Sequence, residues 1–184
     1  MAGGAGRRLG RTKGDLVLDG AALALRAARL LAPLCAGVLV SVRPGDANPA
    51  PGYPAIEDAP PAGRGPLAGI AAAFCATTDA DLLVLACDYP LVETELLRGL
   101  VGGRDEAHDL VLVRDPQGRD HPLLAVWRRG MQQAVREALE NEQLRVTDLV
   151  ATSRVLRLGS EAFPGLDLER ALLNVNRPND LRRI

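Results

Sequence analysis

The amino-acid sequence predicts a three-layer α/β/α sandwich with a mainly parallel sheet. One reason is that apolar, β-branched runs alternate along the chain with segments in which leucines recur at helical spacing. A second is that residues 81–87 and 109–114 are apolar almost throughout, which is typical of central strands covered on both faces. Ligands of such folds bind outside the carboxyl ends of the strands, so polar residues that follow a strand are candidates for function.

The first elements are a helix and a strand. Residues 21–34 carry leucines at helical spacing, and Pro33 disrupts the last turn. Residues 37–43 are apolar and β-branched, and the Pro- and Gly-rich residues 44–54 after them predict a surface loop. No apolar run stands ahead of the glycine-rich start, so we expect the first strand of the sheet to be absent or truncated.

Three further helices are expected around the two central strands. They cover residues 66–77, 93–101 and 130–141, and the apolar run 122–127 precedes the last of them. With 184 residues and no interdomain linker, we expect a single domain that spans residues 1–184.

The composition argues against several classes of binding partner. The 22 basic and 23 acidic residues nearly cancel, so no general attraction to nucleic acid or to anionic membranes is expected. The three cysteines form no CxxC pair, which argues against a disulfide framework or a zinc site. The apolar stretches are short and interrupted, so we expect a soluble, cytoplasmic protein that binds small molecules.

Lys13 is the only lysine among the 22 basic residues, and it closes a glycine-rich run that starts at Gly3. Glycines let backbone N–H groups approach an anion, and an ammonium group can follow a phosphate through a reaction. The run therefore predicts a phosphate site. The alternative is a solvated turn with one surface lysine, since the run matches neither the Walker pattern nor the dinucleotide fingerprint.

Asp88 directly follows the strand 82–87, where a carboxylate can hold a magnesium ion against phosphates. Its alternative role is a turn or capping residue. Asp58 offers a second carboxylate before a Pro-rich turn. Gly69 lies in a Pro- and Gly-containing helix start, where bare backbone can approach a flat ligand such as a nucleobase.

Two further polar groups could contact a second substrate. Arg119, Asp120 and His121 stand together before an apolar strand; the alternative for His121 is that it caps a turn. Asn174 and Asn176 alternate in an apolar segment that we expect to be a strand, so their amides would share a face and could read a polar ring. The alternative is that these amides satisfy turn backbone.

Six motifs, in order, resemble the molybdenum cofactor guanylyltransferases over nearly the whole chain. They lie at residues 2–13, 56–58, 65–69, 87–91, 119–122 and 174–176. The resemblance implies a Rossmann-like nucleotidyltransferase fold that transfers GMP from GTP to the terminal phosphate of molybdopterin, with Mg2+ and with release of pyrophosphate. It also implies molybdoenzymes or cofactor-delivery proteins as further partners.

The resemblance also implies site roles. The residues implied to act on the transferring phosphates are Lys13, Arg8 and Asp88, with Asp88 also holding the metal. The residues implied to bind the nucleotide are Ala2, Gly3, Gly4, Lys13, Ser41, Asp58, Gly69 and Asp88. The residues implied to face the pterin are Arg119, Asp120, His121, Asn174 and Asn176.

The chain departs from the family pattern at its start. Family members have a hydrophobic strand ahead of the glycine loop, whereas Met1 stands where that strand should end, so we expect a start assigned too late. Thr12 and Ser41 replace an Asp and an Asn that are frequent in the family. Two alternatives remain: a related nucleotidyltransferase that uses CTP or a sugar phosphate, and a non-catalytic nucleotide-binding or docking protein.

Overall fold

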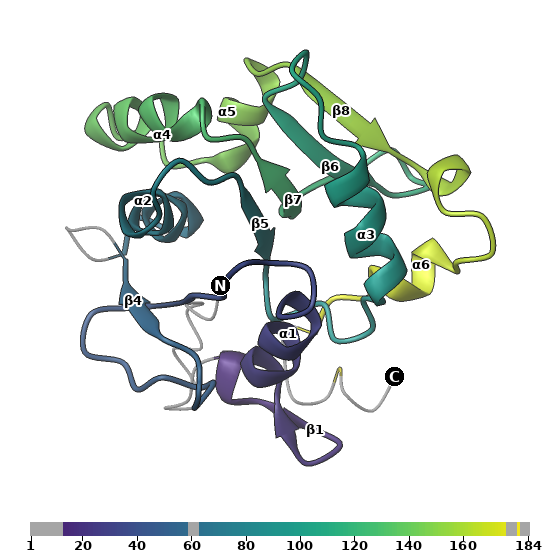
Figure 1. The fold of residues 1–184 in the computed structure, drawn as a ribbon, viewed down its shortest axis with the longest axis horizontal. Coiled ribbons are helices and arrows are strands. Elements are labelled where there is room, and N and C mark those ends of the chain that lie inside the picture. The colour runs from purple at the N-terminus through teal and green to yellow at the C-terminus, as the bar shows by residue number, and fades with distance from the viewer. Residues whose placement is uncertain (1–12, 59–62, 176–179, 181–184) are drawn as a thin grey trace.

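The computed structural model describes residues 13–58, 63–175 and 180 (Figure 1). The helices are α1 (Leu23–Leu31), α2 (Pro66–Ala76), α3 (Thr94–Gly102), α4 (Met131–Glu140), α5 (Val146–Ala151) and α6 (Leu168–Ala171), with 3-10 turns η1 (Lys13–Asp15) and η2 (Ser160–Ala162). The strands are β1 (Val17–Leu18), β2 (Ala21–Ala22), β3 (Val40–Val42), β4 (Ala55–Glu57), β5 (Leu82–Leu85), β6 (Leu110–Arg114), β7 (Asp120–Trp127) and β8 (Val155–Leu158).

Four strands form the main sheet in the order β5-β7-β6-β8. Strand β7 runs antiparallel to both β5 and β6, whereas β6 and β8 are parallel. A second sheet joins β3 and β4 in parallel, and a short antiparallel pair joins β1 and β2. Within the described residues, β3 and β5 therefore belong to separate sheets, and neither is paired with the other.

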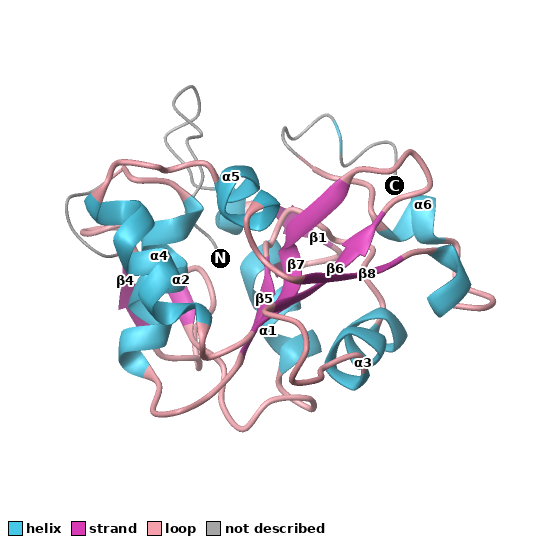
Figure 2. Cartoon of the chain, turned by 90° about the horizontal axis from the view of Figure 1, so that it is seen from above, coloured by secondary structure: helices cyan, strands magenta, loops and turns pink. Residues whose placement is uncertain are grey.

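Alternating side chains of the main sheet enter two hydrophobic cores, one on each face. Leu110 and Leu112 of β6 lie in a core shared with α2, α4 and α5, while Val111 and Val113 lie in a core shared with α1, α3 and α6. Figure 2 shows the helices gathered on opposite sides of the strands. This arrangement confirms the predicted layered α/β class.

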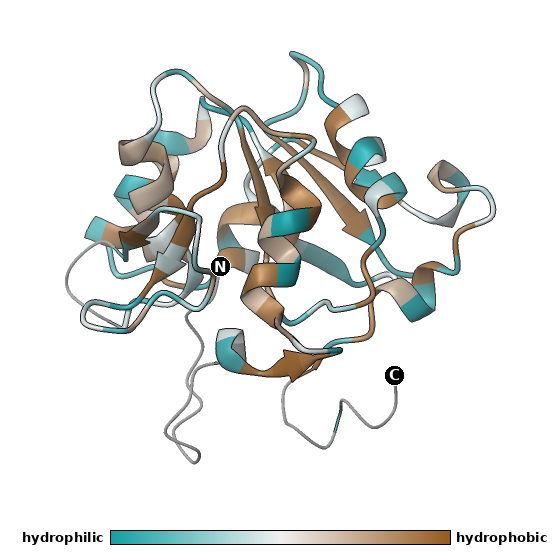
Figure 3. Ribbon diagram, turned by 60° about the horizontal axis from the view of Figure 1, so that its bottom comes forward, coloured by the Kyte–Doolittle hydropathy of each residue, from teal (hydrophilic) through white to brown (hydrophobic). Residues whose placement is uncertain are grey.

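The distribution of hydropathy follows these layers. Figure 3 shows apolar residues concentrated in the strands and on the helix faces beside them, with polar residues on the outer turns. The largest buried side chain is Trp127 at the end of β7, and its indole N–H donates to the Pro122 carbonyl at 3.0 Å. No helix in the described ranges is long and apolar enough to cross a membrane.

The predicted helices are confirmed, but three details of the strands differ. Pairing in the main sheet is more mixed than predicted, because a tight turn between β6 and β7, with Gly118 at φ +82°, reverses the chain. Strand β5 pairs only with β7 in the described structure, so it is not central. Strand β3 is shorter than predicted, because only Val40–Val42 meet β4.

The end of the described chain also differs from the prediction. Residues 173–175 are not in a strand, because the N–H of Val175 donates to the carbonyl of Asp88 at 2.8 Å and not to a neighbouring strand. The sequence reading did not identify β8 or the short helices α5 and α6. Each of these three elements has only four to six residues, too few for a clear periodic pattern.

Helix α3 supplies a test of core packing. A Cβ at Gly99 would lie 2.5 Å from a ring carbon of the buried Phe163, whereas a Cβ at Gly102 on the same helix would meet nothing within 4 Å. We expect Gly99→Ala to lower the free energy of unfolding by about 1–3 kcal/mol through overpacking. Gly102→Ala is the matched control, and its better helix propensity should leave stability unchanged or raised by less than about 1 kcal/mol. Equal stability of the two variants in urea unfolding would contradict this packing.

Candidate active site at the carboxyl ends of three strands

Ser41, the middle residue of β3, meets Asp58, which directly follows the neighbouring strand β4. The Ser41 hydroxyl donates to Oδ1 of Asp58 at 2.5 Å, and the backbone N–H of Asp58 donates to the carbonyl of Val42 at 2.8 Å. The parallel pairing of β3 with β4 places both residues at the same edge. Burial raises the pKa of the Asp58 carboxyl, and the hydrogen bond from Ser41 opposes this effect only in part. The ionised form of Asp58 is therefore less stable in the folded protein than in water.

Asp88 lies at the corresponding end of β5. Val40 and Val42 of β3 share one hydrophobic cluster with Cys87, the residue before Asp88, so the carboxyl ends of β3 and β5 are close together. Val175 belongs to the same cluster and binds the Asp88 carbonyl through its backbone N–H. The fold therefore brings the segment that carries Asn174 to the edge that carries Asp88.

A chain of hydrogen bonds runs from Tyr89, which lies near Asn174, into the protein interior. The Tyr89 hydroxyl lies 3.0 Å from Nδ1 of His121, and Nε2 of His121 lies 3.0 Å from Oδ2 of Asp115. The Asn174 side chain is near enough to Tyr89 to act to lower its pKa. An ionised carboxylate can only accept, so Nε2–H donates to Asp115 and Nδ1 accepts from the Tyr89 hydroxyl. Tyr89 is thereby left to accept from the Asn174 amide.

The electrostatics favour this direction of donation. Burial, with the nearby charge of Asp88, raises the pKa of Tyr89 to about 12, so its hydroxyl keeps its proton at neutral pH. Burial also acts to raise the pKa of Asp115, but the backbone N–H of Arg119 and the His121 ring outweigh it and hold that pKa below its usual range. His121 itself is only 6% exposed. It works as a buried connector between Tyr89 and Asp115.

The neighbours of His121 in the sequence have other positions. Asp120 accepts from the Arg114 guanidinium at 2.8 Å and from the Arg157 guanidinium at 3.1 Å, which ties β6, β7 and β8 together. Burial acts to raise the pKa of Asp120, and the two arginines outweigh it to leave the pKa lowered. Arg119 is exposed in the turn, and its N–H donates to Asp115. Of the three, His121 alone is joined to Asn174 by contacts that the structure describes.

Gly69 lies on α2, which begins at Pro66 after Gly65, a residue at φ +71° that a side chain would strain. Gly69 is buried and faces the same cavity as Ser41. The remaining predicted site residues, Ala2, Gly3, Gly4, Arg8 and Asn176, lie outside the described residues, as does the side chain of Lys13. The backbone of Lys13 forms the start of η1.

The sequence analysis missed Asp115 and the connecting role of Tyr89. The signal for Asp115 was its place at the start of a Pro- and Gly-containing turn, six residues ahead of His121. No group of three or more His, Cys, Asp or Glu side chains that could hold a metal exists within the described residues.

Comparison with known proteins shows the family of this chain. Residues 1–155 match the MobA-like NTP transferase domain. A protein of Pelotomaculum thermopropionicum, named probable molybdenum cofactor guanylyltransferase, is 35% identical over 98% of this chain and 87% of its own length. A protein of the same name from Chloroflexus aggregans is 34% identical over 100% of this chain and 90% of its own length.

Solved structures show the same fold. Molybdopterin-guanine dinucleotide biosynthesis protein A from Archaeoglobus fulgidus superposes with a TM-score of 0.79 at 25% identity, over 99% of this chain and 93% of its own. A 2-C-methyl-D-erythritol 4-phosphate cytidylyltransferase from Thermus thermophilus superposes with a TM-score of 0.68 at 17% identity, over 94% of this chain and 91% of its own, which shows the fold alone. Because the family model covers most of the chain and the relatives carry the same name, the chain belongs to the MobA-like nucleotidyltransferase family and is a transferase of molybdenum cofactor biosynthesis.

Proposed function

We propose that this protein transfers GMP from GTP to the terminal phosphate of the molybdopterin form of the molybdenum cofactor, with Mg2+ as the metal. The observation that carries the proposal is the meeting of Asp88 with the Asn174 segment through the Val175–Asp88 backbone bond. This bond connects Asp88, which is expected to act at the nucleotide phosphates, with the segment of Asn174, which is expected to contact the pterin. The names of the two relatives support the same reaction. We also propose a cytoplasmic location, as for a soluble biosynthetic enzyme.

The reaction needs positioning and charge neutralisation more than a strong base. An oxygen of the acceptor phosphate attacks the α-phosphorus of GTP, the bond from that phosphorus to the bridging oxygen of the β-phosphate breaks, and pyrophosphate leaves with the bond electrons. Bound Mg2+ would supply Lewis-acid stabilisation of the phosphate charge. Two polyanions must approach one another, so fixed cations at Lys13 and Arg8 would lower the barrier further.

The described side chains divide between the two substrates. Asp58, held by Ser41, and Gly69 on α2 would bind the nucleotide. Asn174, held by Tyr89, would orient the pterin, with the second amide of Asn176 on the same segment. Asp88 lies between the two groups and would hold the metal. We also propose that molybdoenzymes or cofactor-delivery proteins bind this protein and receive its product.

Calorimetry with GTP, CTP, ATP and UTP in the presence of Mg2+ tests the nucleotide, and turnover with the molybdopterin acceptor tests the reaction. Preferred binding of GTP and formation of the dinucleotide are the expected results. Preferred binding of CTP would instead assign a cytidylyltransferase, and binding without turnover would assign a nucleotide-binding protein.

Asp88→Asn should lower turnover by at least about 100-fold, because the neutral amide is a poor ligand for Mg2+ beside the reacting phosphates. The exposed Asp79→Asn is the matched control, since Asp79 is 89% exposed and Asn tolerates its φ of +50°. Steady-state rates of pyrophosphate release measure both variants. Near-normal turnover of a folded Asp88→Asn protein would contradict the proposed metal role.

Asp58→Asn should weaken GTP binding yet stabilise the unliganded protein at neutral pH. The folded-state pKa of Asp58 lies above the unfolded value, so ionised Asp58 destabilises the fold. The parent protein should therefore lose stability as pH rises from the unfolded pKa through the folded pKa. The stability difference between variant and parent should grow across that range and stay constant above it. Thermal unfolding from pH 3 to pH 8 measures the difference, and Asp79→Asn should show no such growth.

Tyr89→Phe should raise the KM for the acceptor by about 3- to 10-fold while leaving the KM for GTP within about twofold. The variant removes the hydroxyl that lies between Asn174 and His121, and one intramolecular hydrogen bond is worth about 0.5–1.5 kcal/mol. Tyr53→Phe is the control, because Tyr53 makes its described hydrogen bonds through its backbone. Equal changes in both KM values would show that Tyr89 supports the fold in general and not the acceptor side.

A further inference from the structure

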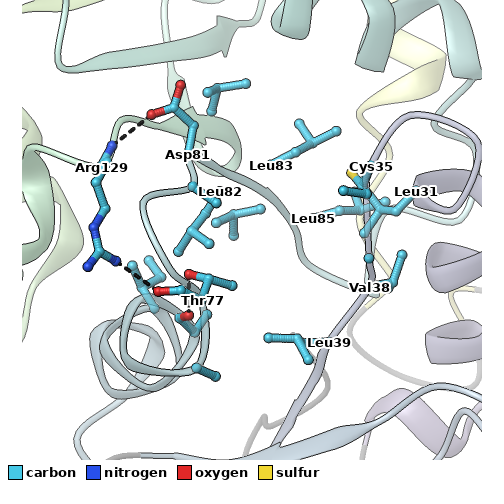
Figure 4. A pocket seen from close by; sticks show the side chains of 18 of the residues that line it. Leu31, Cys35, Val38, Leu39, Thr77, Asp81, Leu82, Leu83, Leu85 and Arg129 are labelled. Atoms are coloured by element: carbon cyan, nitrogen blue, oxygen red, sulfur yellow. Dashed lines mark hydrogen bonds between the residues drawn. The ribbon is translucent and has the colours of Figure 1, made fainter.

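Two polar networks lie beyond opposite ends of strand β5, and they differ in what fixes the direction of their hydrogen bonds. In the first network, the backbone N–H of Arg129 donates to Asp81 at 2.8 Å and its guanidinium donates to the Thr77 carbonyl at 3.2 Å (Figure 4). An N–H group can only donate, and a carboxylate or carbonyl oxygen can only accept. Each bond of this network therefore has one possible direction.

The second network contains groups that can both donate and accept. It consists of Asp115, His121 and Tyr89, with Asn174 beside Tyr89. A hydroxyl, a neutral imidazole and an amide each carry a donor and an acceptor, whereas an ionised carboxylate only accepts. Asp115 is therefore the one member of this set with a fixed role, and the directions of the other bonds follow from it.

The carboxylate of Asp115 is held on both of its oxygens. One oxygen accepts the backbone N–H of Arg119 at 2.8 Å, and the other lies 3.0 Å from Nε2 of His121. The side chains of Asp115 and His121 are only 12% and 6% exposed, so water has little access to replace their bond. The proton of the neutral ring therefore lies on Nε2, and Nδ1, 3.0 Å from the Tyr89 hydroxyl, accepts.

The direction set at Asp115 extends to Asn174. Tyr89 uses its one proton in the bond to the ring, so it offers only lone pairs toward Asn174. Burial raises the pKa of Tyr89 and the Asn174 side chain acts to lower it, which is the effect of a hydrogen-bond donor. The backbone bond from Val175 to Asp88, at 2.8 Å, independently brings these two segments together. The amide NH2 of Asn174 therefore faces Tyr89, and its carbonyl oxygen points away.

We propose that Asp115 is a positioning residue for the molybdopterin substrate, which acts through the tautomer of His121 and through Tyr89 to present the carbonyl oxygen of Asn174 to an N–H group of the pterin ring. The inference rests on the proposed function for the identity of the ligand, and it adds the polarity of the contact. Asn174 is exposed, so this oxygen is open to a ligand. A pterin has N–H groups on its pyrimidine ring, whereas a carbonyl or phosphate oxygen at this point would place lone pairs against lone pairs.

The tautomer of His121 is measured directly by nitrogen-15 NMR of the histidine rings, at pH 8 and without substrates. The chain has two histidines, so His108→Gln assigns the signals. We expect a neutral His121 ring with its proton on Nε2. A ring protonated on Nδ1, or on both nitrogens, would overturn the proposal whether or not the protein transfers GMP, and this result needs no variant of the network.

Asp115→Asn should reverse the network, because its side-chain oxygen can still accept the N–H of Arg119 while its amide NH2 donates to Nε2. Nδ1 of His121 then carries the proton and donates to Tyr89, whose hydroxyl donates outward. We expect the dissociation constant of molybdopterin to rise by about 10-fold, because the Asn174 amide then turns its donor toward the pterin. The dissociation constant of GTP should stay within about twofold.

Asp105→Asn is the matched control. Both oxygens of the exposed Asp105 lie 2.9 Å from Nδ1 of His108, so this variant changes the other His–Asp pair of the described residues. It should leave the His121 signals and both dissociation constants as in the parent protein.

The combined readouts separate this proposal from the proposed reaction. A tautomer that changes in Asp115→Asn without weaker molybdopterin binding would overturn the proposal, as would an equal loss of GTP binding. A parent protein that binds molybdopterin but forms no dinucleotide would contradict the proposed transfer, while a selective loss of molybdopterin binding in Asp115→Asn would still support the role of Asp115.

Discussion

The carboxylate of Asp115 links the architecture of the main sheet to the candidate active site. One oxygen accepts the backbone N–H of Arg119 and closes the turn that makes β7 antiparallel to β6, and the other accepts from His121. The same side chain therefore sets the direction of a strand and orients the ring that holds Tyr89. Because a buried His needs both ring nitrogens satisfied, the turn and the site stabilise one another.

The part of the fold that the sequence could predict is the part with long, regular apolar patterns. Helices α2, α3 and α4 and strand β6 follow directly from such patterns. The order of strands could not be predicted in the same way, because pairing depends on turns and on contacts between distant segments. Residues 37–39 illustrate this: their composition favours a strand, yet without a partner on the described side they form none.

The candidate site shows the same division. The position of Asp88 after an apolar run predicted it as a site residue, since strand ends are where ligands bind in this class of fold, whereas the role of Asp58 came from the resemblance; both roles stay predictions. Asp115 was missed, because only the turn that follows it, signalled by a Pro and a Gly, makes His121 its neighbour. Asp120 was identified as a substrate residue from its motif, and the described contacts instead join it to Arg114 and Arg157. The pterin-facing roles of Asp120 and His121 therefore stay predictions.

The short hydrogen bond between Ser41 and Asp58 has a thermodynamic consequence for ligand binding. A carboxyl whose pKa is raised by burial becomes easier to ionise when a cation or a hydrogen-bond donor arrives beside it. Binding in mildly acidic solution would then release a fraction of a proton to the solvent. The heat of binding would change with the ionisation enthalpy of the buffer, and the slope of that dependence would count the protons that leave Asp58.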